Sequence, residues 1–166
     1  MSDGFFDIDG HYTIRYGDAL AVETGIIVHG CNCQGIMGGG IALQVRNRFP
    51  IAYNMYREAH RIFGLTLGEI IPVEVAPKKY IVNAMTQDNC GSDKRYVDYE
   101  AIAKCFEKVT ELARSIHLNQ GKDGVKLDIV FPMIGAGLAG GNWKIIETII
   151  LETIGPDYNK VLYKFP

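Results

Sequence analysis

Two glycine-rich segments constrain this sequence most, because each lies where an apolar run gives way to a helical pattern. The first spans residues 35–40 and follows the apolar run 25–32; the second spans residues 135–141 and follows the run 127–132. Glycine lets a backbone approach a ligand closely, and helix N-termini present free N–H groups with a partial positive charge. Two such loops facing each other across a parallel sheet could hold a diphosphate, so we expect a nucleotide diphosphate ligand.

Size and charge limit the possible functions. The chain has 166 residues, 48% of them apolar and 22% charged, which suits one globular domain over residues 1–166. A net charge of -2 argues against non-specific binding to DNA or RNA, which requires a basic surface. The N-terminus is acidic where a signal peptide would be basic, and no apolar run is long enough to cross a bilayer. We therefore expect a cytoplasmic protein without a membrane partner.

Cysteines and histidines raise the question of a metal site. Cys31 and Cys33 are too close on a strand to pair easily, so a disulfide framework is not expected. His29, Cys31 and Cys33 alternate and would share one face of a strand, as metal ligands can. No second Cys/His pair with the spacing of a zinc site follows elsewhere. We therefore interpret these residues as small or buried groups at a strand end, and expect neither a metal nor a cofactor.

The hydrophobic pattern predicts alternating strands and helices. We expect strands over residues 12–16, 26–29, 67–75, 80–85, 127–132 and 161–165, and helices over residues 41–49, 52–63, 99–117 and 143–154. Asp98 and Asn142 are expected to cap the last two helices. The alternation predicts an α/β fold, a three-layer α/β/α domain with a mixed, largely parallel sheet. Ligands of such sheets bind at the carboxyl ends of the strands, where both glycine loops lie.

Two familiar nucleotide-binding motifs are disfavoured. Gly135, Gly137 and Gly140 form a literal G-x-G-x-x-G, but a Rossmann fingerprint opens the first βαβ unit, whereas this one has a single helix and strand after it. The Rossmann fingerprint also needs an acidic residue at the end of the next strand. Asp157 is at about the right distance along the sequence, but it lies next to Pro156 and before the last strand. The first loop lacks the Gly-Lys-Ser/Thr of a P-loop. A dinucleotide-dependent dehydrogenase and phosphoryl transfer from ATP are therefore both unlikely readings of these loops.

Four stretches of the sequence resemble a macrodomain, and the match extends over nearly the whole chain. They are Tyr-Gly-Asp at 16–18, Ile-Val-His-Gly-Cys-Asn-Cys at 27–33, Met-Gly-Gly-Gly-Ile-Ala at 37–42 and Pro-Met-Ile-Gly-Ala-Gly-Leu at 132–138. The second and third, followed by Arg48-Phe49-Pro50, are similar to the branch of ADP-ribose 1''-phosphate phosphatases. The resemblance implies the macrodomain fold, ADP-ribose binding, and hydrolysis of ADP-ribose 1''-phosphate to ADP-ribose and phosphate.

The resemblance also implies a set of ligand contacts. Asp18 matches the aspartate that contacts adenine, with Ala19 next to it, and Asn32 matches the asparagine that bonds the distal ribose. Tyr163 on the last strand would flank the adenine. The diphosphate would lie against Gly38, Gly39, Gly40, Ile41, Gly135, Ala136, Gly137 and Leu138. The alternatives are a turn or helix-cap role for Asp18, a turn role for Asn32 and a core role for Tyr163.

His29 is the predicted catalytic residue, because the matching histidine of the phosphatase branch is linked to turnover. An imidazole with a near-neutral pKa can protonate a leaving oxygen or orient water. Asn32 and Asp88 complete the predicted catalytic set, with Asp88 as an acid or base. A hydrogen-bonded core histidine and an ordinary loop aspartate remain the alternatives.

A related macrodomain branch removes ADP-ribose from glutamate with a lysine nucleophile and an aspartate of the second loop. Here the corresponding positions hold Gln87 and Ala139. Glutamine cannot form a Schiff base, so that mechanism is disfavoured, whereas hydrolysis of ADP-ribosyl esters on proteins through a bound water stays open. Two hypotheses follow: a phosphatase acting on ADP-ribose derivatives, and a non-catalytic reader of free ADP-ribose or ADP-ribosylated proteins.

Overall fold

A mixed sheet of seven strands runs through the part of the chain that the structure describes, residues 6–8, 11–91, 93–121 and 123–165 of a computed structural model. The strands are β1 Phe6–Ile8, β2 Tyr12–Tyr16, β3 Gly25–Asn32, β4 Ile70–Ala76, β5 Lys79–Gln87, β6 Ile129–Phe131 and β7 Lys160–Lys164. Their order is β1-β2-β7-β6-β3-β5-β4, and the four inner pairings are parallel, while β1 and β4 join the two edges antiparallel. The prediction of a largely parallel mixed sheet is confirmed.

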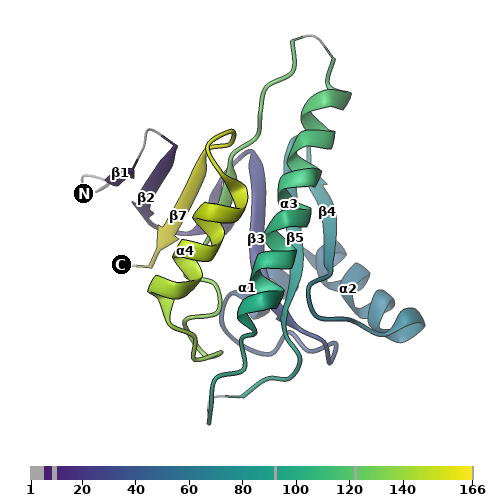
Figure 1. Ribbon diagram of the computed structural model, residues 1–166. Helices are drawn as coiled ribbons and strands as arrows, with labels where there is room; N and C mark the ends of the chain where they lie inside the picture. Colours follow the sequence, from purple (N-terminus) through teal and green to yellow (C-terminus); the bar gives the residue numbers. More distant parts are fainter. Residues whose placement is uncertain (1–5, 9–10, 92, 122, 166) are drawn as a thin grey trace.

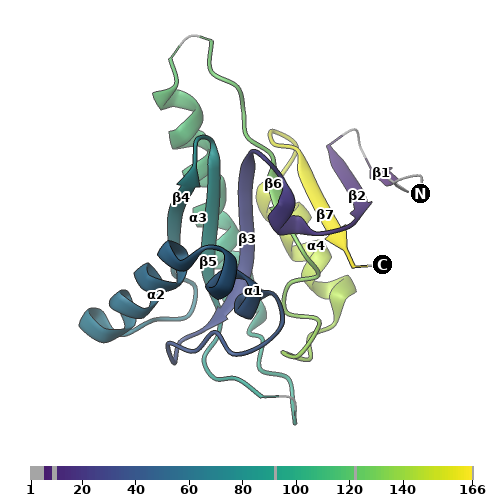
Figure 2. The ribbon, with the colours of Figure 1, turned by 180° about the vertical axis from the view of Figure 1, so that it is seen from behind.

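Helices cover both faces of this sheet. Helices α3 (Tyr99–Asn119) and α4 (Trp143–Ile154) lie over one face in Figure 1, and α1 (Gly40–Arg48) and α2 (Pro50–Phe63) lie over the other in Figure 2. A short 3-10 helix, η1 (Ala19–Ala21), follows β2. The three-layer α/β/α architecture is thus confirmed. No helix of the described residues is long and apolar enough to cross a membrane.

The central strand β3 is buried on both faces, as its continuous apolar run predicts. Ile26 and Val28 pack into the core under α3 and α4, where Phe106 also lies. Ile27 and Cys31 point the other way, into the core under α1 and α2. Strand β3 pairs with β5 on one side and with β6 on the other. Its side chains contribute to both cores, and its carboxyl end leads into the first glycine loop.

Both predicted helix caps are confirmed. The Asp98 carboxylate accepts a hydrogen bond from the Ala101 N–H at 2.9 Å, and the Asn142 amide oxygen accepts one from the Lys144 N–H at 3.0 Å. Each satisfies one of the backbone donors that a helix N-terminus leaves without a partner. Helix α3 continues to Asn119, two residues beyond its predicted end.

Several predicted strand limits were wrong. Strand β3 continues past His29 to Asn32, whereas β6 has three residues instead of six: it begins only at Ile129 and ends before Pro132, which has no N–H to donate to the sheet. Strand β4 begins at Ile70 rather than 67, since Gly68, at a φ of 86°, lies in a turn. The short edge strand β1 was not predicted.

Gly141, in the second glycine loop, has no room for a side chain. An added Cβ would lie 2.6 Å from the Gly135 carbonyl oxygen and 2.6 Å from Val97 Cγ1. At Gly137, four residues earlier, an added Cβ would meet no heavy atom within 4 Å. The second loop is therefore tightly packed at its end and open at its centre.

This difference gives a test of the loop packing. We predict that Gly141→Ala lowers the free energy of unfolding by about 1–3 kcal/mol, since the crowding atoms include backbone that cannot yield easily. Gly137→Ala should leave it within about 1 kcal/mol of the wild type. Denaturant unfolding measures both variants, and equal losses in the two would contradict the packing described.

Candidate functional site

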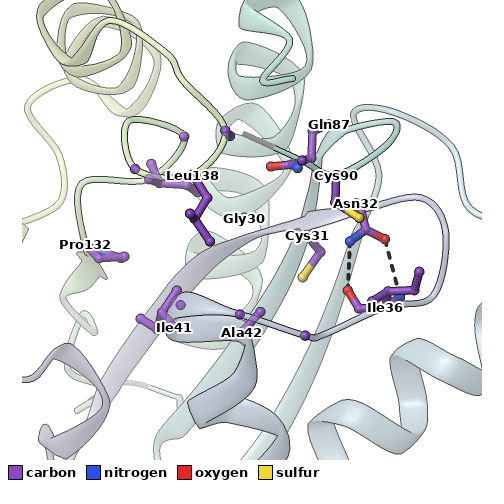
Figure 3. Close-up of a pocket in the computed structure, with 18 of the residues that line it drawn as sticks. Gly30, Cys31, Asn32, Ile36, Ile41, Ala42, Gln87, Cys90, Pro132 and Leu138 are labelled. Carbon is purple, nitrogen blue, oxygen red and sulfur yellow. Dashed lines mark hydrogen bonds between the residues drawn. The ribbon is translucent and has the colours of Figure 1, made fainter. Parts of the chain in front are cut away.

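A cavity of about 460 Å³ opens where β3, β5 and β6 reach their carboxyl ends (Figure 3). Both glycine loops contribute to its wall. Its lining consists of residues 30–32, 36, 38–42, 87, 90, 91, 132–135 and 137–139. The position agrees with the rule that open α/β sheets bind ligands at the carboxyl ends of their strands.

Helix α1 begins inside the cavity wall without a side-chain cap. Its N-cap residue is Gly39, which makes no capping hydrogen bond, in contrast to Asp98 and Asn142 at α3 and α4. Gly40, Ile41 and Ala42 of the first turn line the cavity. The unpaired N–H groups and the positive end of the helix dipole therefore lie at the cavity, an arrangement that favours an anion.

The second glycine loop is held by backbone hydrogen bonds, one within the loop and one from Tyr96. The Gly135 carbonyl accepts a hydrogen bond from Gly141 N at 2.7 Å, and the Ala139 carbonyl accepts one from Tyr96 N at 2.8 Å. The loop approaches the first one closely, since a Cβ added at Gly39 would lie 3.3 Å from Leu138 Cδ1. In Figure 3, Leu138 and Ile41 lie on opposite sides of β3, so the two loops face each other across the cavity.

Asn32 lines the cavity and also shapes the first loop. Its amide oxygen accepts hydrogen bonds from Gln34 N and from the Tyr56 hydroxyl, both at 2.9 Å. Its amide nitrogen donates to the Ile36 carbonyl at 2.8 Å, as Figure 3 shows. Asn32 therefore has the turn-forming role proposed as its alternative, at a position that a ligand can reach.

His29 lies under the cavity wall rather than in it. The side chain is fully buried, and its Nε2 lies 2.7 Å from Asn83 Oδ1. Since the Asn83 amide nitrogen donates to the carbonyls of Ala52 and Ile71, its oxygen must act as the acceptor. We therefore assign the hydrogen of the neutral ring to Nε2; the Cys31 sulfur lies 3.6 Å from Nε2 and 3.8 Å from Nδ1.

Neither group of this pair carries a charge near pH 7. Burial lowers the pKa of His29 to about 4, although the hydrogen bond with Asn83 acts in the opposite direction. Burial raises the pKa of the Cys31 thiol well above its usual value. Cys31 lines the cavity whereas His29 does not, so the geometry makes His29 a support for Cys31. Its catalytic role stays a prediction.

The remaining predicted residues lie outside the cavity lining. Asp18 accepts from Leu20 N at 2.9 Å, which caps η1, and pairs with Arg48 at 2.6 Å. Ala19 is buried in η1, and Tyr163 borders a separate hollow beside Arg15. Asp88 is exposed, and its backbone carbonyl accepts from Cys33 N at 3.0 Å.

Of the predicted site, the structure thus brings together Asn32 and most residues of the two loops. Ala136, within the second loop, does not reach the cavity lining. The residues outside the lining were predicted to contact the adenosine or the distal end of a ligand, and these contacts stay predictions.

Several lining residues were not predicted as site residues. Gln87 and Ala139 line the cavity at the two positions where the related branch has its lysine and aspartate. Their alignment with those positions was the signal that could have marked them. Cys90 and Gly91 come from the segment after β5, whose course no sequence pattern predicted. Among the described residues, no three His, Cys, Asp or Glu side chains group as metal ligands would.

The comparison with known families identifies the chain. A family model described as "Macro domain" matches residues 28–150. This protein belongs to the macrodomain family. The resemblance seen in the sequence is therefore confirmed, and the cavity lies between the two loops that carried it.

Relatives of this macrodomain include two kinds of ADP-ribose hydrolase. A protein of Scheffersomyces stipitis named ADP-ribose 1''-phosphate phosphatase is 29% identical over 163 residues, covering 82% of this chain and 92% of that protein. A DNA ADP-ribosyl glycohydrolase of Mycobacterium tuberculosis is 26% identical over 158 residues, covering 91% of this chain and 41% of that protein. The solved macrodomain of Mycobacterium tuberculosis DarG has a TM-score of 0.74 at 26% identity, covering 90% and 96%. These relatives support a macrodomain that processes ADP-ribose derivatives.

The buried His29 makes stability depend on pH. Its folded-state pKa of about 4 lies below the unfolded value of 6.5, so between these values only the unfolded state binds the proton. We predict that the free energy of unfolding falls by about 3 kcal/mol as the pH drops through this window. His29→Gln should flatten the dependence, while His11→Gln, at an exposed site, should not. Denaturant unfolding at pH 7, 6 and 5 tests this; equal slopes in wild type and His29→Gln would refute it.

Proposed function

We propose that this macrodomain binds ADP-ribose in the cavity and hydrolyses ADP-ribose 1''-phosphate to ADP-ribose and phosphate. One observation carries the proposal: the uncapped N-terminus of α1 faces the second glycine loop across the cavity. Helix N–H groups on one side and a loop of small residues on the other suit a diphosphate. The phosphatase of Scheffersomyces stipitis supports the choice of substrate.

The order of the strands gives the ligand a direction. Asp18 follows β2, the two glycine loops follow β6 and β3, and Gln87 ends β5. A ligand whose diphosphate lies between the loops would then extend its adenosine toward β2 and its distal ribose toward β5. The distal phosphate of ADP-ribose 1''-phosphate would thus lie near Asn32 and Gln87.

Catalysis would rest on the positioning of the substrate and on the partial charges of backbone groups. Water attacks the phosphorus, the bond to the anomeric oxygen breaks, and this oxygen takes up a proton. The described lining contains no carboxylate, histidine, lysine or arginine, so amide groups and the α1 dipole would stabilise the phosphate. His29, through Cys31, would hold the wall in place. Esters of ADP-ribose on proteins are a second proposed substrate class, without a covalent step because Gln87 offers no nucleophile.

A reader function is the second candidate, and the same uncharged lining favours it. Apart from the thiols of Cys31 and Cys90, the described lining offers no ionisable acid or base, and such a site can bind well and turn over little. In that case ADP-ribosylated proteins would be the partners, and ADP-ribose would remain bound unchanged.

Binding itself is tested at the open centre of the second loop. Gly137 lines the cavity and a Cβ added there meets no heavy atom within 4 Å, so Gly137→Val adds a branched side chain to the wall without a clash at Cβ. We predict that it weakens ADP-ribose binding by about tenfold or more, since the diphosphate loses the space that this side chain takes, while the unfolding midpoint stays close to that of the wild type. Isothermal titration calorimetry and thermal unfolding measure the two effects. Unchanged affinity would place the ligand elsewhere.

Turnover is tested by phosphate release from ADP-ribose 1''-phosphate. We predict release by the wild type and a decrease in kcat of about tenfold or more in His29→Gln, because Gln cannot reproduce the contact with Cys31. ADP-ribose affinity should stay within about threefold in that variant, since His29 does not line the cavity. If the wild type binds ADP-ribose and releases no phosphate, the protein is a reader or acts on protein-linked ADP-ribose.

A further inference from the structure

Thr86 on β5 carries a buried hydroxyl without a partner. Its side chain is fully buried, and Oγ1 has no hydrogen-bond partner among the described residues. Among the described residues, the only other buried side-chain nitrogen or oxygen without a partner is Nε2 of Gln120, at the C-terminal end of α3. An unpaired buried hydroxyl lowers the stability of the fold, so native structures keep few of them. Thr86 therefore requires an explanation.

The hydroxyl lies directly behind the cavity wall. A Cβ added at Gly30 would be 2.7 Å from Thr86 Oγ1 and 3.2 Å from Ile134 Cγ1. Gly30 and Ile134 both line the cavity, and Figure 3 shows Gly30 on β3 between Leu138 and Cys31. The Gly30 backbone is not in the left-handed region, so its φ does not require glycine. The missing side chain instead lets the Thr86 hydroxyl and the Ile134 side chain pack against the Gly30 backbone.

Thr86 also lies at the end of the cavity where a distal ribose would be. It immediately precedes Gln87, which lines the cavity and pairs with Asn32 across β3 and β5. Strand β5 is the parallel strand farthest from β2 and Asp18. The hydroxyl is therefore near the cavity wall at the end opposite to the adenosine.

We infer that Thr86 is a substrate-positioning residue whose hydroxyl donates a hydrogen bond to an oxygen at the distal ribose end of the ligand. The inference rests on the proposed function and adds a specificity contact to it. Since the Thr86 side chain is fully buried, this contact requires the Ile134 side chain to turn aside so that a ligand oxygen reaches the hydroxyl past Gly30. The hydroxyl that is unpaired in the free protein is then paired in the complex, so it contributes to affinity for ligands that have this oxygen.

The decisive variant is Thr86→Val, which keeps the shape of the side chain and removes the hydroxyl. We expect ADP-ribose to bind it about fivefold to thirtyfold more weakly than the wild type. ADP, which lacks the distal ribose, should bind both proteins equally. The unfolding midpoint should stay the same or rise, because an unpaired buried polar group is removed. Thr86→Ser should retain ADP-ribose affinity.

Thr110→Val serves as the matched control, since the Thr110 hydroxyl donates to the Phe106 carbonyl within α3, away from the cavity. It should bind ADP-ribose like the wild type. Equal ADP-ribose affinity in Thr86→Val and wild type would overturn the inference, as would equal weakening of ADP and ADP-ribose. A lower unfolding midpoint with unchanged affinity would show a purely structural hydroxyl. If the wild type binds neither ligand, the proposed function fails, and the inference fails with it.

Discussion

The burial of β3 on both faces is the constraint on which the site depends. Side chains of this strand alternate between two cores, and its neighbours β5 and β6 are both parallel to it. The face toward α1 and α2 carries His29 and Cys31, while the other face carries Gly30. Because both faces are closed by helices, a shift of β3 by one residue would take His29 away from Asn83 and turn it toward α3 and α4. The strand end, and with it the first glycine loop, is therefore fixed relative to the second loop.

The ligand proposed for the cavity is an anion, although the wall has no cationic side chain among its described residues. Backbone N–H groups and the dipole of α1 replace lysine and arginine in this role. Such a site depends on the shape of the backbone, which is why glycines predominate in it. It also separates binding from chemistry, since the groups that hold the diphosphate need not supply an acid or a base.

Local signals predicted most of the fold. The caps Asp98 and Asn142 could be predicted because a capping side chain bonds a backbone N–H only two or three residues further along the sequence. The placement of His29 could not be predicted in the same way. Alternation put it on one face with Cys31, but which of the two opens to the cavity depends on how α1 and α2 pack over the sheet. Asp18 shows the same limit, since its ion-pair partner Arg48 is 30 residues away.

Two polar residues lie side by side at the end of β5. Thr86 brings an unpaired hydroxyl behind the wall, and Gln87 brings an amide where the related branch has its nucleophile. An amide and a hydroxyl can orient a ribose or a phosphate, but neither forms a covalent intermediate as a lysine does. If the glycine loops hold the diphosphate as proposed, a change confined to the end of β5 alters the groups around the distal ribose and leaves the diphosphate contacts intact.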